Sequence, residues 1–351
     1  MARPFSDLWL PSGSFPPFIV AELSGNHNRS LDRALALVEA AADCGVDAVK
    51  LQTYTADTIT LDIARDDFVV RKAGSVWDGR TLHSLYDEAH TPWEWHRPII
   101  EKAASLGLQW FSSPFDFTAV DFLEELGAPC HKIASPEIVD LPLIKKCAQT
   151  GKPLLISTGM STFEEIGEAV ETARANGCSR LVLLKCTTDY PASPENSNLR
   201  TIPHLSEKLG CPAGLSDHTM GIGAALAATA LGAVLIEKHL TLNRTDGGPD
   251  AHFSMEPHEM KCLVTESRAA WASLGTVSSG PTAAEKDYLR GRRSLYICED
   301  LAAGDVLTPA NIRSVRPGFG LHPRHYEELL GKRVAAAIRK GTPASFDLLV
   351  P

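Results

Sequence analysis

The chain has 351 residues, of which 44% are hydrophobic and 22% are charged, a composition typical of soluble globular proteins. Its 34 basic and 43 acidic residues give a net charge of −9, which argues against a surface for nucleic acid or an anionic membrane. The segment Met1–Pro17 lacks the apolar core of a signal peptide, and no run approaches the about 18 apolar residues of a membrane span. Eight scattered cysteines without a CxxC pair are typical of reduced, structural thiols. We therefore expect a cytoplasmic protein.

Short apolar, β-rich runs alternate with segments of helical period between Phe18 and Gly275. The first run, Phe18–Glu22, is followed by a helix that Ser30 is expected to cap and Gly45 to end. Seven further runs follow in chain order: Ala48–Gln52, Gln109–Ser113, Cys130–Ser135, Pro153–Thr158, Leu181–Thr187, Ala213–Asp217 and Val234–His239. Amphipathic segments such as Phe163–Asn176 and Ile222–Leu231 separate the runs.

Eight strand–helix units in one stretch predict a parallel (β/α)8 TIM barrel over residues 1–275. A doubly wound open sheet is the alternative, but no G-x-G-x-x-G motif follows the first strand. The long interval Tyr54–His90, called here the Tyr54–His90 segment, interrupts the alternation after the second strand. A loop in this position lies at the catalytic face of a barrel, so we expect it to form a pocket wall or a lid.

The composition changes after Gly275. Residues 276–291 are expected to be a linker with one short helix at Thr282–Arg290, and residues 292–351 a compact module. This module is predicted to have a strand at Ser294–Ile297 and a helix near His325–Leu330. About 60 residues bury little core unaided, so the module is expected to pack on its own barrel or on that of a partner.

Polar residues end every predicted barrel strand, and in this fold those ends form the active site. Ammonium groups in a partly dry cleft require an anion, and hydroxyls suit phosphate oxygens. Three lysines with several hydroxyls therefore predict a small ligand bearing phosphate and carboxylate. The alternative is that Lys132 or Lys185 pairs with Glu137 or Glu237 inside the barrel. The strand-end lysines are Lys50, Lys132 and Lys185.

Two histidines end the predicted strands seven and eight. Adjacent strands lie about 4.8 Å apart, so His218 and His239 can share a metal, with Glu22, carbonyls or water as the remaining ligands. Nitrogen and oxygen ligation without thiolate suits Mn²⁺, with Mg²⁺, Co²⁺ or Zn²⁺ as alternatives. The other interpretation is two buried, hydrogen-bonded histidines without a metal.

Motifs along nearly the whole chain resemble the sialic acid synthase family. They are Ala21–Asn28, Val49–Thr53, Ser112–Phe115, Lys132–Ser135, Ser157–Met160, Leu215–His218 and Glu237–His239. Arg316-Pro317-Gly318 resembles part of that family's C-terminal antifreeze-like (SAF) domain. Leu85–His96 and Ser314–Pro323 are more similar to the pseudaminic acid synthase branch than to the N-acetylneuraminate or legionaminate branches, and Thr188 stands where neuraminate synthases often carry Asn.

The resemblance implies substrates, site residues and an assembly. The substrates would be phosphoenolpyruvate and an amino-sugar aldehyde, here 2,4-diacetamido-2,4,6-trideoxy-L-altrose. Phosphoenolpyruvate would be held by Lys50, Ser113, Lys132, Ser135, Ser157, Thr188 and Ser216. The sugar and the attacking water would face Glu22, Gln52, Glu137, Tyr190 and Asp250. Arg316 would reach the sugar site of a partner barrel, in a homodimer swapped through its SAF domains.

The implied reaction joins C3 of phosphoenolpyruvate to the aldehyde carbon, with His218 and His239 holding the metal and C–O cleavage releasing phosphate. Glu22 is expected to stabilise charge at C2 or to activate the water that adds there. A less polar pocket is expected for a 6-deoxy sugar, and Trp77, Trp93 and Trp95 are either its apolar wall or core of the loop. A non-catalytic sugar-binding barrel is the alternative from another class of protein.

Overall fold

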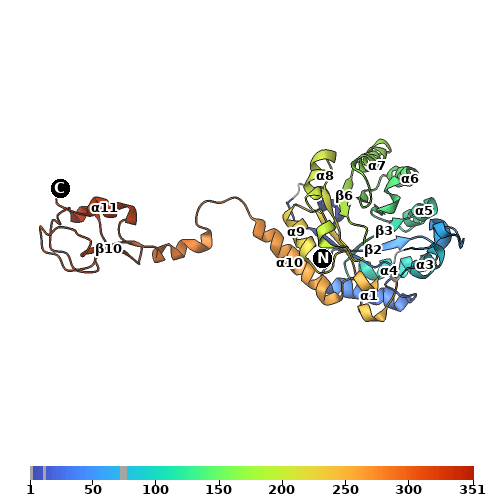
Figure 1. Ribbon diagram of the computed structural model, residues 1–351, viewed down its shortest axis with the longest axis horizontal. Helices are drawn as coiled ribbons and strands as arrows, with labels where there is room; N and C mark the ends of the chain where they lie inside the picture. Colours follow the sequence, from blue (N-terminus) through green and yellow to red (C-terminus); the bar gives the residue numbers. More distant parts are fainter. Residues whose placement is uncertain (1–2, 11–12, 72–76) are drawn as a thin grey trace. The chain divides into compact units, whose positions relative to one another are not determined.

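The computed structural model describes residues 3–10, 13–71 and 77–351. The chain divides into two compact units, Met1–Gly275 and Thr276–Pro351, and each is described by itself (Figure 1). Part of the Tyr54–His90 segment, residues 72–76, lies outside the described residues.

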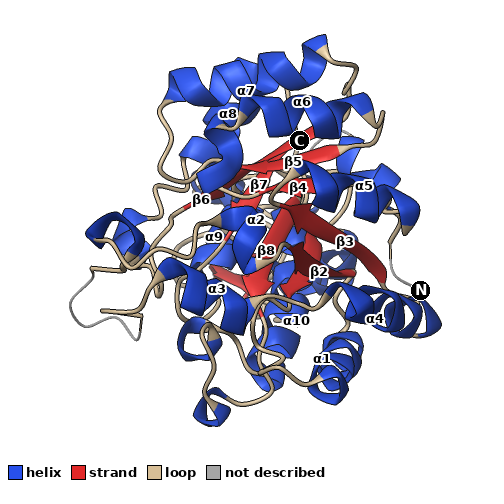
Figure 2. Ribbon diagram, turned by 90° about the vertical axis from the view of Figure 1, so that its right-hand side faces the viewer, coloured by secondary structure: helices blue, strands red, loops and turns tan. Residues whose placement is uncertain are grey.

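The first unit is a closed barrel of parallel strands in sequential order, as predicted. Strand β8 closes the barrel by pairing with β1, where His239 lies opposite Glu22. Figure 2 shows helices surrounding this sheet. The strands are β1 (Phe18–Glu22), β2 (Ala48–Thr53), β3 (Gln109–Pro114), β4 (His131–Ile133), β5 (Leu154–Ser157), β6 (Leu181–Cys186), β7 (Ala213–Ser216) and β8 (Leu235–His239).

Helices connect the strands at the positions where the apolar period indicated them. The first helix confirms both of its expected ends, because the Ser30 side chain accepts from the Arg33 N–H and Gly45 has a left-handed φ of 78°. The helices of this unit are α1 (Leu31–Cys44), α2 (Ala56–Ile59), α3 (Leu82–Ala89), α4 (Trp93–Ser105), α5 (Phe117–Glu125), α6 (Leu141–Gln149), α7 (Phe163–Ala175), α8 (Thr201–Leu209), α9 (Gly223–Ala230) and α10 (Pro257–Leu274).

Side chains alternate along each strand, and the inward set changes from apolar to polar toward the strand ends. The apolar layer inside the barrel includes Phe18, Val20, Phe111, Leu155 and Leu235. A 3-10 helix before β1 (Phe5–Trp9) packs on this layer. The Phe5 ring centroid lies 5.2 Å from that of Phe18, so this helix closes the end of the barrel where the strands begin.

The second unit is a small β-structure with its own core. Strand β9 (Ser294–Ile297) pairs antiparallel with β10 (Ile312–Val315), and α11 (Tyr326–Leu329) follows. The predicted strand and helix of this module are therefore confirmed. The interval predicted as a linker contains a 3-10 helix, Ala283–Gly291. The core of this unit comprises Leu295, Ile297, Leu301, Leu307, Ile312, Leu329, Val334, Ile338 and Ala344.

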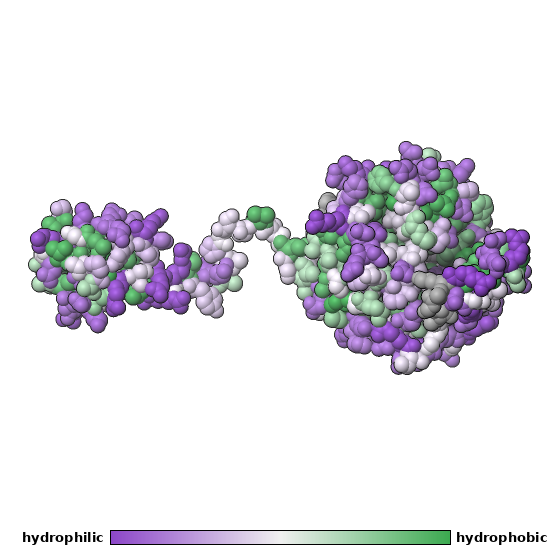
Figure 3. Space-filling view, viewed as in Figure 1, coloured by the Kyte–Doolittle hydropathy of each residue, from purple (hydrophilic) through white to green (hydrophobic). Residues whose placement is uncertain are grey.

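The surface carries many hydrophilic residues, which cover much of the visible face of the barrel unit in Figure 3. Within the part of the chain that the structure describes, no helix is both long and apolar enough to cross a bilayer.

Candidate active site

A cavity of about 280 Å³ lies at the carboxyl ends of the barrel strands. The inward side chains change from apolar to polar there, so one part of the cavity is cationic and rich in hydroxyls. Aromatic side chains form another wall. The predicted site residues that line it are Lys50, Gln52, Lys132, Ser135, Ser157, Thr188, Tyr190, Ser216, His218, His239 and Asp250.

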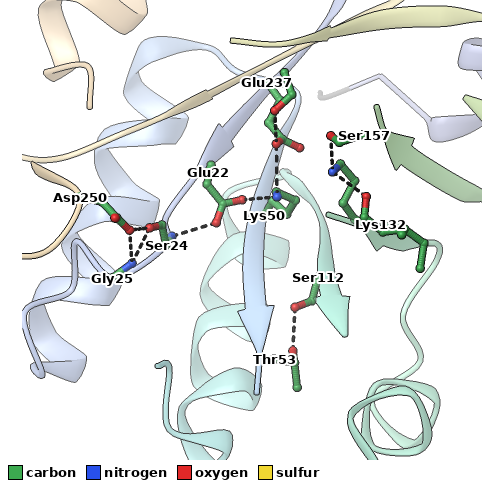
Figure 4. A network of polar contacts seen from close by, with 12 residues as sticks. Glu22, Ser24, Gly25, Lys50, Thr53, Ser112, Lys132, Ser157, Glu237 and Asp250 are labelled. Carbon is green, nitrogen blue, oxygen red and sulfur yellow. Dashed lines mark hydrogen bonds and ion pairs between the residues drawn. The ribbon is translucent and has the colours of Figure 1, made fainter. Parts of the chain in front are cut away.

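Lys50 lies between two buried carboxylates (Figure 4). Its Nζ is 2.7 Å from Glu22 Oε2 and 3.2 Å from Glu237 Oε1. Burial disfavours the ammonium, but the two carboxylates outweigh burial and hold the pKa of Lys50 above its usual range. An ammonium group has three N–H donors, so the two ion pairs leave one for a ligand.

Glu22 lies behind Lys50 and does not line the cavity. Its side chain is 0% exposed, and its Oε1 accepts from the Ser24 N–H at 3.1 Å. Burial and the nearby Glu237 raise the pKa of Glu22 to about 7, although Lys50 opposes this shift. Glu22 therefore reaches the cavity through Lys50, which it contacts directly, and its expected role toward the sugar and the water stays a prediction.

Glu237, unlike Glu22, does line the cavity, as Asp250 does, and no role was predicted for Glu237 beyond a lysine partner. Its Oε1 accepts from the Ser216 hydroxyl at 3.0 Å, and its Oε2 is buried with no hydrogen-bond partner among the described residues. Ser216 has one hydroxyl hydrogen, and this contact uses it. The sequence could have indicated Glu237, because it is two residues before His239 on the same strand and therefore points to the same inward face.

Lys132 is the second cation of the cavity. Its Nζ donates to Ser157 Oγ at 2.6 Å and to Ile133 O at 3.1 Å, which again leaves one N–H for a ligand. Burial lowers the pKa of Lys132 to about 8, although Glu237 favours the charged form. The Ser157 oxygen accepts in this contact, so its own hydrogen remains for an anion.

Two further hydroxyls lie beside Ser157, at Ser135 and Thr188. Ser135 Oγ accepts from the Gly159 N–H at 3.0 Å. Thr188 Oγ1 is buried and has no hydrogen-bond partner within the described ranges. These hydroxyls and Lys132 form a group of donors without a matching set of acceptors, here called the donor cluster and defined as Lys132, Ser135, Ser157 and Thr188. Such a cluster requires an anion with several oxygens.

The two histidines lie at the cavity with their ring centroids 5.3 Å apart. His218 Nδ1 donates to Thr187 O at 2.9 Å, which leaves Nε2 as a ligand atom. Burial and the neighbouring His218 hold the pKa of His239 well below its usual value, so this ring is neutral, as metal ligation requires. His239 Nδ1 is buried without a hydrogen-bond partner in the described part of the chain.

These properties fit a metal held by two imidazoles, with water or substrate as the other ligands. The described residues contain no group of three or more His, Cys, Asp or Glu side chains suited to a metal ion. The metal therefore stays a prediction.

The Tyr54–His90 segment forms one wall of the cavity with Tyr54, Trp77, Leu85, Tyr86 and Ala89. This confirms the expected pocket wall. Of the three tryptophans considered for an apolar wall, only Trp77 contributes. The Trp93 ring stacks on Phe122 with centroids 4.6 Å apart, and Trp95 packs against the core beside His27.

Besides Glu22, four predicted residues lie outside the cavity lining. Ser113 is buried and points into the barrel, but it does not reach the cavity. Glu137 follows β4 on a short 3-10 helix (Pro136–Val139) and is not part of the lining, although its buried carboxylate interacts with Lys132 of the cavity. Lys185 lies on the outward face of β6, where its Nζ donates to Cys186 O at 2.8 Å, so two lysines converge rather than three. Arg316 belongs to the second unit.

A closed barrel with buried cations at the carboxyl ends of its strands has the architecture of a (β/α)8 enzyme with its active site at that end. Residues 37–279 match the model of the NeuB family, and residues 292–350 match that of the SAF domain. The chain belongs to the NeuB family of sialic acid synthases, and the family and fold expected from its motifs are confirmed.

Individual relatives cover almost the whole chain. It is 42% identical over 334 residues to the pseudaminic acid synthase of Helicobacter pylori, covering 95% of this chain and 97% of that one. It is 36% identical over 318 residues to the N,N'-diacetyllegionaminic acid synthase of Campylobacter jejuni, covering 90% and 94%. The crystal structure of an N-acetylneuraminic acid synthetase from Leptospira borgpetersenii in complex with citrate aligns with a TM-score of 0.69 at 31% identity, covering 78% of this chain and 90% of that chain.

Proposed function

We propose that this protein is a pseudaminic acid synthase, which condenses phosphoenolpyruvate with 2,4-diacetamido-2,4,6-trideoxy-L-altrose and releases phosphate. The observation that carries the proposal is the donor cluster beside Lys50, which offers more hydrogen-bond donors than the protein itself satisfies. The choice of sugar is supported by 42% identity to a pseudaminic acid synthase against 36% to a legionaminic acid synthase. The eight free thiols support a cytoplasmic location.

The residues divide the work of the reaction by charge. The donor cluster holds the phosphate, and the remaining N–H of Lys50 holds the carboxylate, so that C3 is oriented toward the aldehyde carbon. Formation of the C–C bond leaves an alkoxide on the former aldehyde carbon. Water then adds to C2 and one of its protons passes to Glu237, a carboxylate that lines the cavity and can return that proton to the alkoxide. The C2–O bond to phosphate in the adduct then breaks, the phosphate leaves with the bridging oxygen and takes up the proton of the C2 hydroxyl, and C2 becomes a ketone.

A divalent metal, preferably Mn²⁺, is proposed at His218 and His239, where it would polarise the aldehyde oxygen and contribute several kcal/mol of charge stabilisation. The neutral state of His239 and the free Nε2 of His218 support this site. Chelator treatment is expected to abolish turnover, and added Mn²⁺ to restore it. Full activity in metal-stripped protein would exclude the metal.

A domain-swapped homodimer is proposed, in which Arg316 enters the sugar site of the partner barrel. Arg316 is exposed and makes no ion pair or side-chain hydrogen bond with the described residues. Two large apolar side chains of the same unit are also exposed, Tyr288 at 80% and Phe319 at 61%. Exposed apolar side chains in the unit that carries this unpaired arginine support a surface that packs on another barrel.

Phosphate release in the presence of phosphoenolpyruvate tests the proposed function directly. The diacetamido trideoxy sugar is expected to give a higher kcat/KM than its legionaminic acid counterpart or N-acetylmannosamine. A preference for either competitor would identify that synthase instead, and no phosphate release with any sugar would favour a non-catalytic barrel. With ¹⁸O in the bridging position, the label is expected in phosphate, and its retention in the sugar acid would exclude C–O cleavage.

A further inference from the structure

Gly159 follows β5 directly below the donor cluster. Its backbone N–H donates to Ser135 Oγ, which fixes that oxygen at 3.0 Å. Its φ does not lie in the left-handed region, so the backbone at this position does not require glycine. The reason for a glycine must therefore be sought in the space around it.

That space is filled by two hydroxyls. A Cβ added to Gly159 would lie 2.7 Å from Ser135 Oγ and 3.1 Å from Ser135 Cβ, and it would collide with Thr188 Oγ1. The two nearest obstructing atoms are hydroxyl oxygens rather than backbone, and the third is Ser135 Cβ. A methyl group would therefore have to displace the two hydroxyls.

The same two hydroxyls line the cavity with Ser157 and Lys132. The Gly159 N–H holds Ser135 Oγ, and Thr188 Oγ1 has no hydrogen-bond partner among the described residues, so the absence of a side chain at Gly159 lets both oxygens come close to it. We propose that Gly159 is a positioning residue that sets the spacing of the phosphate-binding hydroxyls of Ser135 and Thr188. This inference rests on the proposed function for the identity of the anion, and Gly159 itself touches no substrate.

The test compares Gly159→Ala with Gly167→Ala, a helical glycine around which an added Cβ meets nothing within 4 Å. Gly159→Ala is expected to raise KM for phosphoenolpyruvate about tenfold or more, because small misplacements of binding groups are costly. KM for the sugar is expected to match that of Gly167→Ala, and the melting temperature is expected to be no lower than that of the wild type. Calorimetric titration with inorganic phosphate and with phosphoenolpyruvate is expected to show the same selective loss.

Thr188→Ala adds a second measurement, because it removes one of the two obstructing oxygens. Gly159→Ala is expected to cost less in the Thr188→Ala background than in the wild type, since part of the collision is gone. Additive losses would overturn the proposal, as would unchanged phosphate binding by Gly159→Ala. A rise in sugar KM equal to that for phosphoenolpyruvate, or a lower melting temperature, would assign Gly159 a general structural role instead.

The anion titrations need no sugar. Wild-type protein that binds phosphate but releases none with any sugar would contradict the proposed function and leave the role of Gly159 standing. Turnover of the diacetamido sugar by the wild type, together with unchanged anion binding by Gly159→Ala, would support the proposed function and contradict the role of Gly159.

Discussion

The two lysines of the cavity have opposite pKa shifts, although both are buried. Lys50 is held between two carboxylates, whereas Lys132 contacts a hydroxyl and a carbonyl, which do not offset its desolvation. The pKa of Lys132 falls to about 8 as a result. Lys132 therefore carries its charge at neutral pH but loses it at moderately alkaline pH.

This difference predicts an alkaline limit for substrate capture. The ammonium form of Lys132 binds the anion and prevails below its pKa, so kcat/KM for phosphoenolpyruvate should fall as pH rises through about 8. Lys132→Arg, which stays charged, should move this limb upward even if its maximal rate is lower. The pH profiles of the two proteins check the assignment, and an unchanged limb in the arginine variant would contradict it.

Glu237 offers a second prediction at the same scale. Glu237→Gln removes the charge that faces the cavity, so kcat should fall on the order of 100-fold if this carboxylate accepts the proton of water. Asp121→Asn removes a carboxylate from an exposed surface ion pair and serves as the control. Steady-state kinetics with both substrates decide the matter, and a kcat within about twofold of wild type would exclude this role.

The sequence supports the composition of this site better than its orientation. Lys50, Lys132, Ser157 and both histidines could be predicted because polar residues end barrel strands. Glu22 and Glu237 also end strands, but their relation to Lys50 depends on how β1, β2 and β8 meet, which is a tertiary property. Gly159 lies within the Ser157–Met160 motif, but its role could not be predicted from the motif. That role depends on the absence of a side chain beside Ser135 and Thr188, which are distant in sequence.

At the scale of elements, the barrel strands were predictable from apolar runs bounded by turns, and β1 begins and ends where expected. The helices α2 and α3 of the Tyr54–His90 segment were not predicted. α2 spans only Ala56–Ile59, and short helices acquire their stability from packing rather than from period. Strand β4 is shorter than its apolar run, because Ser135 already begins the turn to the 3-10 helix Pro136–Val139.

Strand β7 contains a glycine whose place depends on its neighbours. A Cβ added to Gly214 would collide with Leu235 O and lie 3.0 Å from a Leu184 methyl, and the backbone of β8 cannot yield as a side chain can. Gly214→Ala should therefore lower the free energy of unfolding by about 1–3 kcal/mol. Gly167→Ala should instead raise it by about 0.5–1 kcal/mol, because alanine suits the interior of helix α7. Urea unfolding compares the two, and equal stabilities would contradict the argument.

At the scale of the whole molecule, the sequence predicted both the barrel and the small β-module, but the arrangement of subunits does not follow from local patterns. The proposed swap can be tested by complementation. Lys50→Ala disables the barrel, and Arg316→Ala disables the contribution of the second unit. After subunit exchange, about one quarter of all sites should combine an intact barrel with an intact Arg316 from the partner.

Recovered activity in the mixture, with neither variant active alone, would support the swap. If each barrel used its own Arg316, mixing would recover nothing, because no chain carries both intact residues. The activity of wild-type protein at about one quarter of the total protein concentration gives the scale for the expected recovery.

The 3-10 helix Phe5–Trp9 has a practical consequence for work with this enzyme. This helix covers the end of the barrel at which the strands begin. A recombinant version trimmed to begin at Phe18 would therefore expose the apolar layer inside the barrel to water at that end. Buried Phe5 and Leu8 would be lost with it. Affinity tags and surface attachment are better placed where they do not disturb the packing of Phe5–Trp9 on the barrel.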